Sequence, residues 1–413
     1  MRTIVWLCVV PRTTRHSRMP SQRSHFLLPT IIVASPANAM PPRVLTVYHR
    51  ARTFGGSFNS VLDVLSYVDR QRFHPVAMVP GPGNCADQFN AIGLDVMFGT
   101  EHPGERSLRY LRSVVTFAWR LWRARIALLY VSDYVTWRSS ALAAARLVGI
   151  PRVVHVRSPR EQDYADPELI RATMIVGNSE ATLSGLRRHV PAERLRVVYN
   201  FVDLDRFARG RDIRREFFGG HPRVVGFVGV FRPEKGIEYF LQMARVVHAL
   251  HPDVRFLAAG GESAVEDLGW LERMKQLAVD LGLADVVCFP GSRDDIPDVV
   301  HSIDLLVVPS LNEGFGRVIV EAAAAGVPAV GANAAGIPEV IRDGVTGVLV
   351  PPRDGAATAK AVQALLDAPS RLRELGEAAR LSARERFAPA SQIAKLQEVW
   401  AEALGHTFVT SPR

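Results

Sequence analysis

The sequence predicts an α/β protein with two facing Rossmann-like domains, each a parallel sheet with helices on both faces, and an interdomain cleft between them. Short apolar runs alternate with segments of helical periodicity along the chain, which is typical of parallel strands joined by crossover helices. Two such series of similar size meet near residues 200–215. The length of 413 residues fits two domains of ordinary size. Because ligands bind at the carboxyl ends of parallel strands, we expect one in the cleft.

The first series follows a basic N-terminal head. Its predicted strands are 43–48, 76–79, 126–131, 152–156, 174–176 and 196–199. A loop of the sequence Phe-Gly-Gly-Ser follows the first strand and leads into a predicted helix over 58–68. Residues 200–207 are predicted to form a linker.

The second series repeats the same alternation. Its predicted strands are 223–228, 254–258, 286–289, 305–308, 329–331 and 346–350. Its predicted helices are 237–250, 270–281, 296–302, 318–325, 356–367, 370–387 and 391–404. Gly326 suits a left-handed C-terminal cap for the helix over 318–325, and Pro328 prevents that helix from continuing.

Composition narrows the class of protein. The net charge is +9, but residues 1–39 hold five arginines and no acidic residue, so the rest of the chain carries +4. This mild excess favours a partner that bears phosphates over a nucleic acid, because the chain has no basic run interleaved with aromatic residues of the kind that a nucleic-acid groove needs. Three widely spaced cysteines suggest neither a zinc site nor a disulfide framework, and they favour a reducing, cytoplasmic compartment.

The N-terminal head has two interpretations. Residues 26–39 end in Ala-Asn-Ala, as a signal peptide would, but Pro29 interrupts the apolar core. We therefore favour an over-extended start with residues 1–39 disordered, and a signal peptide stays the alternative. No apolar stretch of roughly 20 residues exists, so no transmembrane helix is expected.

The strongest motif is a pair of glutamates, Glu313 and Glu321, around the start of a predicted helix. Glycines before the helix permit close approach of a ligand, and free N–H groups at a helix start favour an anion or an oxygen-rich sugar. Glu313 can accept hydrogen bonds from sugar hydroxyls, and Glu321 can accept them from a ribose diol. The intervening candidates for donor binding are Gly314, Phe315, Gly316 and Arg317.

With these glutamates and their flanks the chain resembles the family-4 retaining glycosyltransferases, which have the GT-B architecture. The spacing of Glu313 and Glu321 matches the E-x7-E signature of that family. The flanking segments 304–310, 336–341 and 343–347 match as well, the last two as a G-x-P-E-x-I-x-x-G-x-x-G run. The resemblance covers residues 43 to about 404 and is strongest from 223 to 355.

The resemblance implies transfer of a sugar from a nucleoside-diphosphate sugar, most often UDP- or GDP-linked, to an acceptor hydroxyl with retention. It implies no cofactor, and no Asp-x-Asp motif stands in a suitable loop, so no metal is expected. The acceptor stays open: a glycan, a lipid-linked sugar or a small molecule. A nucleotide-sugar epimerase of the same architecture and a non-catalytic sugar-nucleotide binder are the alternatives. A dinucleotide-dependent oxidoreductase is disfavoured, because no G-x-G-x-x-G fingerprint follows either first strand.

The resemblance also implies an organisation of the chain. We expect an acceptor-side domain over 40–205 and a nucleotide-sugar-binding domain over 206–385. Residues 386–413 are expected to form a helix that returns to the first domain, followed by a tail.

A second motif, residues 229–236 (GVFRPEKG), follows a predicted strand and opens a helix, as phosphate-binding loops do. Lys235 offers a point charge and Arg232 a forked donor to a diphosphate. The resemblance makes this segment, from Gly229 on, the donor-diphosphate loop, and it assigns catalytic roles to Glu313, Lys235 and Arg232. Val230 stands where the family often has arginine, so we assign that charge to Arg232.

Weaker candidates complete the predicted donor site. Gly55 and Gly56 permit a tight turn near a ligand. Gly261, Ser292 and Arg293 follow predicted strands and are expected near the nucleotide, although each also fits an ordinary turn.

Two residues at the end of the strand over 152–156 are candidates for the acceptor or sugar side. Many relatives place a histidine at the end of this strand, where this chain has Arg157, and His155 lies two residues earlier on the same strand face. A packed histidine and a surface arginine are the alternative.

Residues 108–126 combine helical apolar periodicity with Arg109, Arg112, Arg120, Arg123 and Arg125. A basic amphipathic helix that also carries Trp119 and Trp122 can lie on an anionic membrane surface. A domain helix with a solvated arginine face is the alternative. We therefore expect either peripheral contact with the inner face of the membrane or an ordinary exposed helix.

Overall fold

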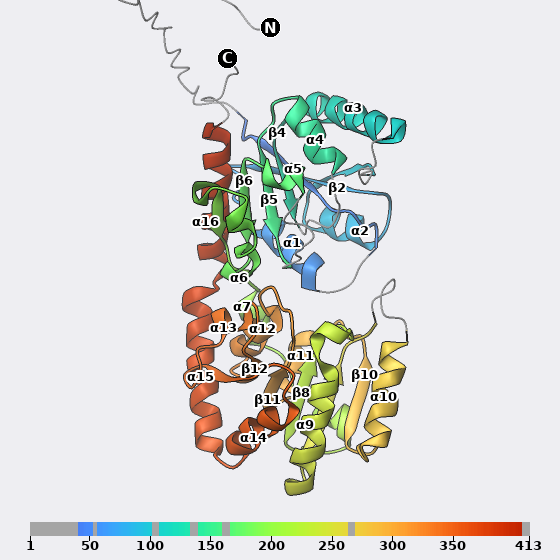
Figure 1. Ribbon diagram of the computed structural model, residues 1–413, viewed down its shortest axis with the longest axis vertical. Coiled ribbons are helices and arrows are strands. Elements are labelled where there is room, and N and C mark those ends of the chain that lie inside the picture. The colour runs from blue at the N-terminus through green and yellow to red at the C-terminus, as the bar shows by residue number, and fades with distance from the viewer. Residues whose placement is uncertain are drawn as a thin grey trace, which may run out of the picture. The chain divides into compact units, whose positions relative to one another are not determined.

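The computed structural model describes residues 40–52, 56–100, 107–132, 139–158, 166–262 and 269–406. The predicted head over 1–39 lies outside these residues. Within them the chain forms two parallel sheets with helices packed against them (Figure 1). This confirms the predicted fold class. The chain from Pro41 onward forms one compact unit.

The first sheet has seven strands in the order β3-β2-β1-β4-β5-β6-β7. Their bounds are β1 Arg43–Val47, β2 His74–Val79, β3 Asp95–Phe98, β4 Ile126–Ser132, β5 Arg152–Val156, β6 Met174–Gly177 and β7 Leu195–Val197. The central strands are nearly continuous apolar runs because both of their faces are covered.

The second sheet has six strands in the order β10-β9-β8-β11-β12-β13. Their bounds are β8 Val224–Val228, β9 Arg255–Ala259, β10 Val287–Gly291, β11 Leu305–Val308, β12 Ala329–Ala332 and β13 Gly347–Val350. Both sheets therefore place their first strand beside their fourth, β1 beside β4 and β8 beside β11. The loops that leave these two neighbours diverge at the carboxyl ends, where open α/β sheets bind ligands.

The helices of the described residues cover these sheets. Around the first sheet they are α1 Gly56–Tyr67, α2 Asn84–Ala91, α3 Leu108–Arg123, α4 Ser140–Leu147, α5 Pro167–Ile170 and α6 Glu180–Leu183. They continue with α7 Leu204–Phe207, α8 Arg214–Phe218, α9 Ile237–Leu250, α10 Trp270–Asp280, α11 Ile296–His301 and α12 Arg317–Ala324. The last four are α13 Ile337–Val340, α14 Gly355–Leu366, α15 Pro369–Arg386 and α16 Pro389–His406. None of the helices in the described part of the chain is long and apolar enough to cross a bilayer.

The structure adds elements that the sequence pattern did not predict. α2 and β3 are short, and β3 is an edge strand of four residues, two exposed and two half-buried, so neither produces a long apolar run. α4 is buried almost all round, so it lacks the alternation of an amphipathic helix. The predicted linker over 200–207 ends in the short helix α7.

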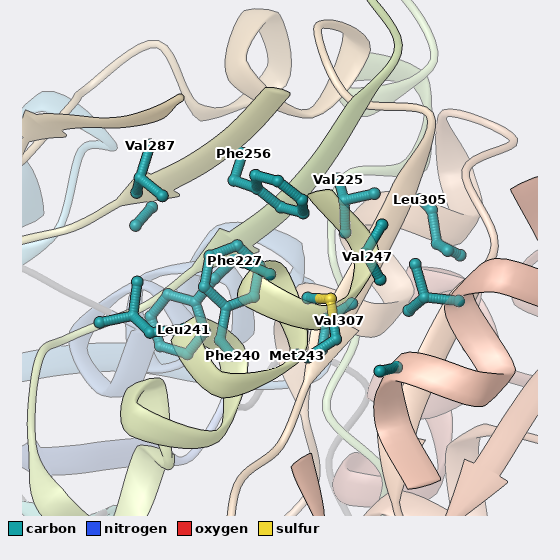
Figure 2. Close-up of a cluster of buried hydrophobic side chains, with 14 of the residues drawn as sticks. Val225, Phe227, Phe240, Leu241, Met243, Val247, Phe256, Val287, Leu305 and Val307 are labelled. Atoms are coloured by element: carbon teal, nitrogen blue, oxygen red, sulfur yellow. The ribbon is translucent and has the colours of Figure 1, made fainter. Parts of the chain in front are cut away.

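An aromatic cluster fixes the position of α9 on the second sheet. Phe227 of β8 packs against Phe240 of α9 with ring centroids 5.9 Å apart, and Phe240 packs against Phe256 of β9 at 6.2 Å (Figure 2). All three side chains are buried. Because the loop after β8 runs directly into α9, this core also fixes the residues of that loop.

The last helix, α16, belongs to the core of the first sheet although it follows the second sheet in sequence. Trp400 is fully buried and packs edge-on against Tyr130 of β4 and Phe73. Gln397 accepts a hydrogen bond from the backbone N–H of Asp69 at 2.8 Å. The C-terminal segment therefore ties the two halves of the chain together.

Candidate functional site

A hydrogen bond joins the loops that follow β8 and β11. They lie at the carboxyl edge of the second sheet, where this topology favours ligand binding. The backbone N–H of Leu311 donates to the carbonyl of Glu234 at 2.8 Å. Gly236 has a φ of 68°, and a Cβ there would lie 2.4 Å from the carbonyl oxygen of Pro309. Only glycine fits this position without displacing the second loop.

This junction brings Lys235 and Glu313 together. The Lys235 Nζ and the Glu313 Oε2 form an ion pair, and the side chains are 25% and 18% exposed. The two residues are thus partly desolvated but still open to solvent. Arg232 lies in the same loop, with its Nη1 3.1 Å from Glu234 Oε1. A compact set of two cations and two carboxylates therefore lies at the carboxyl ends of β8 and β11.

The glycines around Glu313 allow the loop to fit between two other backbone segments. A Cβ at Gly314 would lie 2.0 Å from the carbonyl oxygen of Arg157, which follows β5 of the first sheet. On the other side, the N–H of Gly336 donates to the carbonyl of Glu313 at 2.8 Å. A Cβ at Gly336 would lie 2.2 Å from the Gly314 carbonyl oxygen. Residues from both sheets therefore shape this loop.

The helix α12 begins at Arg317, one residue earlier than predicted, after Gly316 with a φ of 88°. The side chain of Arg317 lies between two acids. Its Nε donates to Glu321 Oε1 at 2.7 Å, and its Nη1 lies 2.6 Å from Asp63 Oδ2 of α1. The same Nη1 donates to the carbonyl of Phe201 at 3.1 Å. Glu321, the predicted ribose ligand, is therefore held by Arg317, and its side chain is 11% exposed.

Burial and charge act in opposite directions on this group of ionised side chains. Burial by itself lowers the pKa of Arg317, but Glu321 and Asp63 outweigh burial and raise that pKa above its ordinary value. Burial raises the pKa of Asp63, and Arg317 offsets this shift only in part. The three side chains therefore depend on one another for compensation of charge.

His155 and Arg157 are both buried, at 1% and 7% exposure. His155 Nδ1 lies 2.8 Å from the hydroxyl of Tyr130, and burial followed by the charge of Arg157 lowers the pKa of His155 well below its ordinary value. Arg157 Nε donates to Ser132 Oγ at 2.9 Å, and its Nη1 donates to the side chain of Asn200. The Arg157 side chain is not at the surface; the residue contacts the Glu313 loop through its carbonyl oxygen.

The other predicted donor residues that the structure describes follow strands of the two sheets. Gly56 begins α1, and a Cβ there would lie 3.8 Å from Cδ of Arg317. The N–H of Gly229 donates to the Ala259 carbonyl at 3.0 Å. Gly261 lies against Ser292, because a Cβ at Gly261 would lie 2.2 Å from Ser292 Oγ. Gly55 falls outside the described residues. Phe315 is buried in the core.

Arg293 has acidic neighbours on its own side of the sheet. Its Nη2 lies 2.5 Å from Asp295 Oδ2 and 3.7 Å from Glu216 Oε2. The guanidinium also stacks over Phe217 at 5.5 Å from the ring centroid. Its side-chain charge is therefore already compensated.

Two residues of this region were given no role by the sequence. Asp63 is a carboxylate within the predicted helix over 58–68, and only its place after the Gly-Gly loop hinted at the site. Glu339 accepts hydrogen bonds from the N–H groups of Glu180 and Ala181, at 2.8 and 2.9 Å, and so caps α6 of the first sheet. Within the described residues, no group of three or more His, Cys, Asp or Glu side chains is arranged to hold a metal ion.

Both halves of the chain match family models of glycosyltransferases. Residues 54–206 match the family model described as Glycosyltransferase Family 4, and residues 209–382 match Glycosyl transferases group 1. The D-inositol 3-phosphate glycosyltransferase of Corynebacterium kroppenstedtii is 34% identical over 259 residues, 60% of this chain and 57% of that protein. The corresponding protein of Mycolicibacterium smegmatis is 34% identical over 285 residues, 67% of this chain and 62% of that protein. The chain therefore spans little more than half the length of these curated relatives.

Solved structures share the fold. Alr3699/HepE of Anabaena, in complex with UDP and glucose, matches 87% of this chain and 100% of its own with a TM-score of 0.75 and 22% identity.

Proposed function

Because the chain belongs to the family-4 glycosyltransferases, we propose that it transfers a sugar from a nucleoside-diphosphate sugar to an acceptor hydroxyl. One observation carries the proposal: Lys235 and Glu313 pair at the carboxyl ends of β8 and β11, where an α/β sheet of this topology binds its ligand. The pair offers a cation to a diphosphate and a carboxylate to sugar hydroxyls.

The proposed role of the cations is to stabilise the departing nucleoside diphosphate. Lys235 exchanges Glu313 for a phosphate oxygen when the donor binds, and Arg232 supplies further donors from the same loop. Charges fixed in a partly desolvated site stabilise the negative charge that grows on the leaving group without reorganisation. Glu313, released from Lys235, orients the sugar ring, and Glu321 accepts hydrogen bonds from the ribose.

We further propose that the configuration at the anomeric carbon is retained. In the proposed step the acceptor oxygen bonds to the anomeric carbon on the face that the diphosphate leaves. The bond from that carbon to the phosphate oxygen breaks, and the acceptor proton passes to that oxygen. The resemblance to retaining enzymes supports this route, which requires no side-chain nucleophile.

The proposed reaction requires neither a metal ion nor an organic cofactor. The support is the presence of Lys235 and Arg232, whose two charges match those that a divalent cation would bring to the diphosphate. We also place the enzyme in the cytoplasm, because the thiols of Cys85 and Cys288 are free, as in a reducing compartment.

The donor is proposed to be a UDP- or GDP-sugar, with UDP-glucose the first to test because Alr3699/HepE was solved with UDP and glucose. The acceptor hydroxyl belongs to a glycan, a lipid-linked sugar or a small molecule. The curated relatives make an inositol phosphate the first small acceptor to test.

A thermal-shift screen of the full chain against UDP- and GDP-sugars identifies the donor, because a ligand of the native state raises the melting temperature. The stabilising donor is then incubated with candidate acceptors, with and without EDTA, and the product is examined by NMR. We expect acceptor-dependent release of nucleoside diphosphate, a product of unchanged anomeric configuration and no effect of EDTA. An altered sugar nucleotide formed without acceptor would identify an epimerase. Donor binding without turnover or hydrolysis would identify a binding protein.

A further inference from the structure

The helix α3 exposes a stripe of large apolar side chains to solvent. Leu108, Leu111, Val115, Trp119 and Trp122 are 85%, 58%, 63%, 54% and 73% exposed. At about 100° per residue these five positions fall within an arc of about 80°. The helix is thus amphipathic, but the stripe is not the face that meets the protein core.

A different face of α3 packs against the protein core. Phe117, Ala118 and Leu121 are buried, and their mean direction lies about a third of a turn from the stripe. Ser113 also faces inward, where its Oγ donates to Ser140 Oγ of α4 at 3.0 Å. The packing of α3 is therefore complete without the five exposed side chains, and burial in this fold does not explain their apolar character.

Arginines lie along the edge of the stripe that faces away from the core. Arg109, Arg112 and Arg123 are exposed, and α3 contains no acidic residue to neutralise them. The Arg123 guanidinium stacks over the Trp119 ring at 5.5 Å from the centroid. An apolar band edged by arginines on a 16-residue helix therefore faces outward.

Two further exposed apolar side chains lie at the end of the neighbouring helix. α4 packs beside α3 (Figure 1), and at its C-terminal end Leu147 and Val148 are 66% and 39% exposed. Seven of the fifteen exposed large apolar side chains in the described part of the chain therefore belong to these two adjacent helices or to the cap of α4.

We propose that this surface, the α3 stripe with its arginine edge, binds the surface of an anionic lipid bilayer. Tryptophan and leucine side chains enter the boundary between headgroups and acyl chains, while guanidinium groups form paired hydrogen bonds with lipid phosphates. A second copy of the chain fits less well, because a symmetric contact would place the arginines of both copies together. The inference goes beyond glycosyl transfer and does not depend on it.

The test measures flotation of the full chain with vesicles of phosphatidylcholine alone and of phosphatidylcholine mixed with phosphatidylglycerol. We expect binding to the mixed vesicles that weakens with added salt. Replacing Trp119 and Trp122 with glutamine should lower the partition coefficient by more than about tenfold. Replacing Arg109, Arg112 and Arg123 with glutamine should lower it about one hundredfold.

Matched controls carry equivalent changes on other surfaces. Val246→Gln with Leu250→Gln alters two exposed apolar residues of α9, and Arg188→Gln with Arg373→Gln and Arg384→Gln removes three exposed charges. These controls should bind vesicles as the parent does. Each variant is first checked for an unchanged melting temperature, and the exposed arginine set provides the test should the tryptophan variant unfold.

Three results would overturn the proposal. The first would be that the parent chain does not float with the mixed vesicles, and the second that both α3 variants float as well as the parent. The third would be that light scattering shows a dimer for the parent and a monomer for the α3 variants. This would assign the stripe to a contact between copies of the chain.

Discussion

Gly314 lies so close to Arg157 that a side chain of any size at position 314 would collide with the Arg157 carbonyl oxygen, which would be 2.0 Å from a Cβ. This contact joins the Glu313 loop of the second sheet to the end of β5 in the first. It is a contact between two backbone segments, so neither rotamer changes nor flexible side chains can relieve it.

Gly314→Ala should therefore displace the Glu313 loop. Because a shift of about 1 Å in a positioning residue can cost about 10²-fold in rate, we expect a loss of this order in kcat/KM for transfer. The matched control is Gly81→Ala, since nothing lies within 4 Å of a Cβ at Gly81. Equal activity of Gly314→Ala and the parent would show that the observed position of the loop is not required for transfer.

The ion pair of Lys235 and Glu313 predicts a loss of function without a loss of fold. Lys235→Ala removes the charge proposed to stabilise the departing diphosphate, and we expect kcat to fall by about 10²–10³-fold. Affinity for the free nucleoside diphosphate, measured by calorimetry, should fall as well. Lys235→Arg should retain part of the activity, because charge is kept while geometry changes.

The control for Lys235 is Lys275→Ala. Lys275 also pairs with a glutamate, Glu272 at 2.7 Å, but on the exposed face of α10. It should leave kcat and nucleotide affinity unchanged. If Lys235→Ala kept full activity, the assignment of the loop after β8 to the diphosphate would be lost.

Much of this site could be predicted from the sequence because its parts are local. The strand ends, the glycines and the glutamate spacing are all readable as patterns, so the sequence predicts that Lys235 and Glu313 contribute to one site. The sheet topology then supplies the reason for their contact, since β8 and β11 are neighbours.

The partners of Arg317 and Glu321 could not be predicted in the same way. Asp63 is separated from Arg317 by most of the chain, and no periodic pattern identifies a contact between α1 and α12. The burial of Arg157 likewise depends on Asn200 and Ser132, two residues far from it in sequence. The edge strand β3 escapes prediction because its four residues, two of them exposed, are too few for a clear periodic pattern.

The Arg317 contacts predict a stability effect. Asp63→Ala leaves Arg317 with one acid in a position where its side chain is only 12% exposed. We expect the free energy of unfolding to fall by about 3 kcal/mol, because removal of one partner leaves a buried charge poorly compensated. Urea denaturation followed by circular dichroism measures this change.

The comparison for Asp63 is Glu377→Ala, which breaks the exposed pair of Glu377 and Arg380 on α15. Its unfolding midpoint should match that of the parent, because exposed pairs contribute little. A midpoint for Asp63→Ala equal to that of the control would mean that the contact between α1 and α12 does not stabilise the fold.

The burial of His155 predicts a dependence of stability on pH. Burial and the neighbouring Arg157 hold the folded-state pKa of His155 well below 6.5, its ordinary value, so the folded protein binds fewer protons than the unfolded chain at acidic pH. This contribution to stability is present above pH about 6.5 and is lost as the pH falls below it, by up to about 1.4 kcal/mol per pH unit.

His155→Gln cannot be protonated, so it should show a shallower loss of stability between pH about 7.5 and about 5.5. Urea denaturation across this range measures both slopes, with the exposed His189→Gln as a control that should follow the parent. Parallel curves for His155→Gln and the parent would show that His155 does not carry this pH dependence.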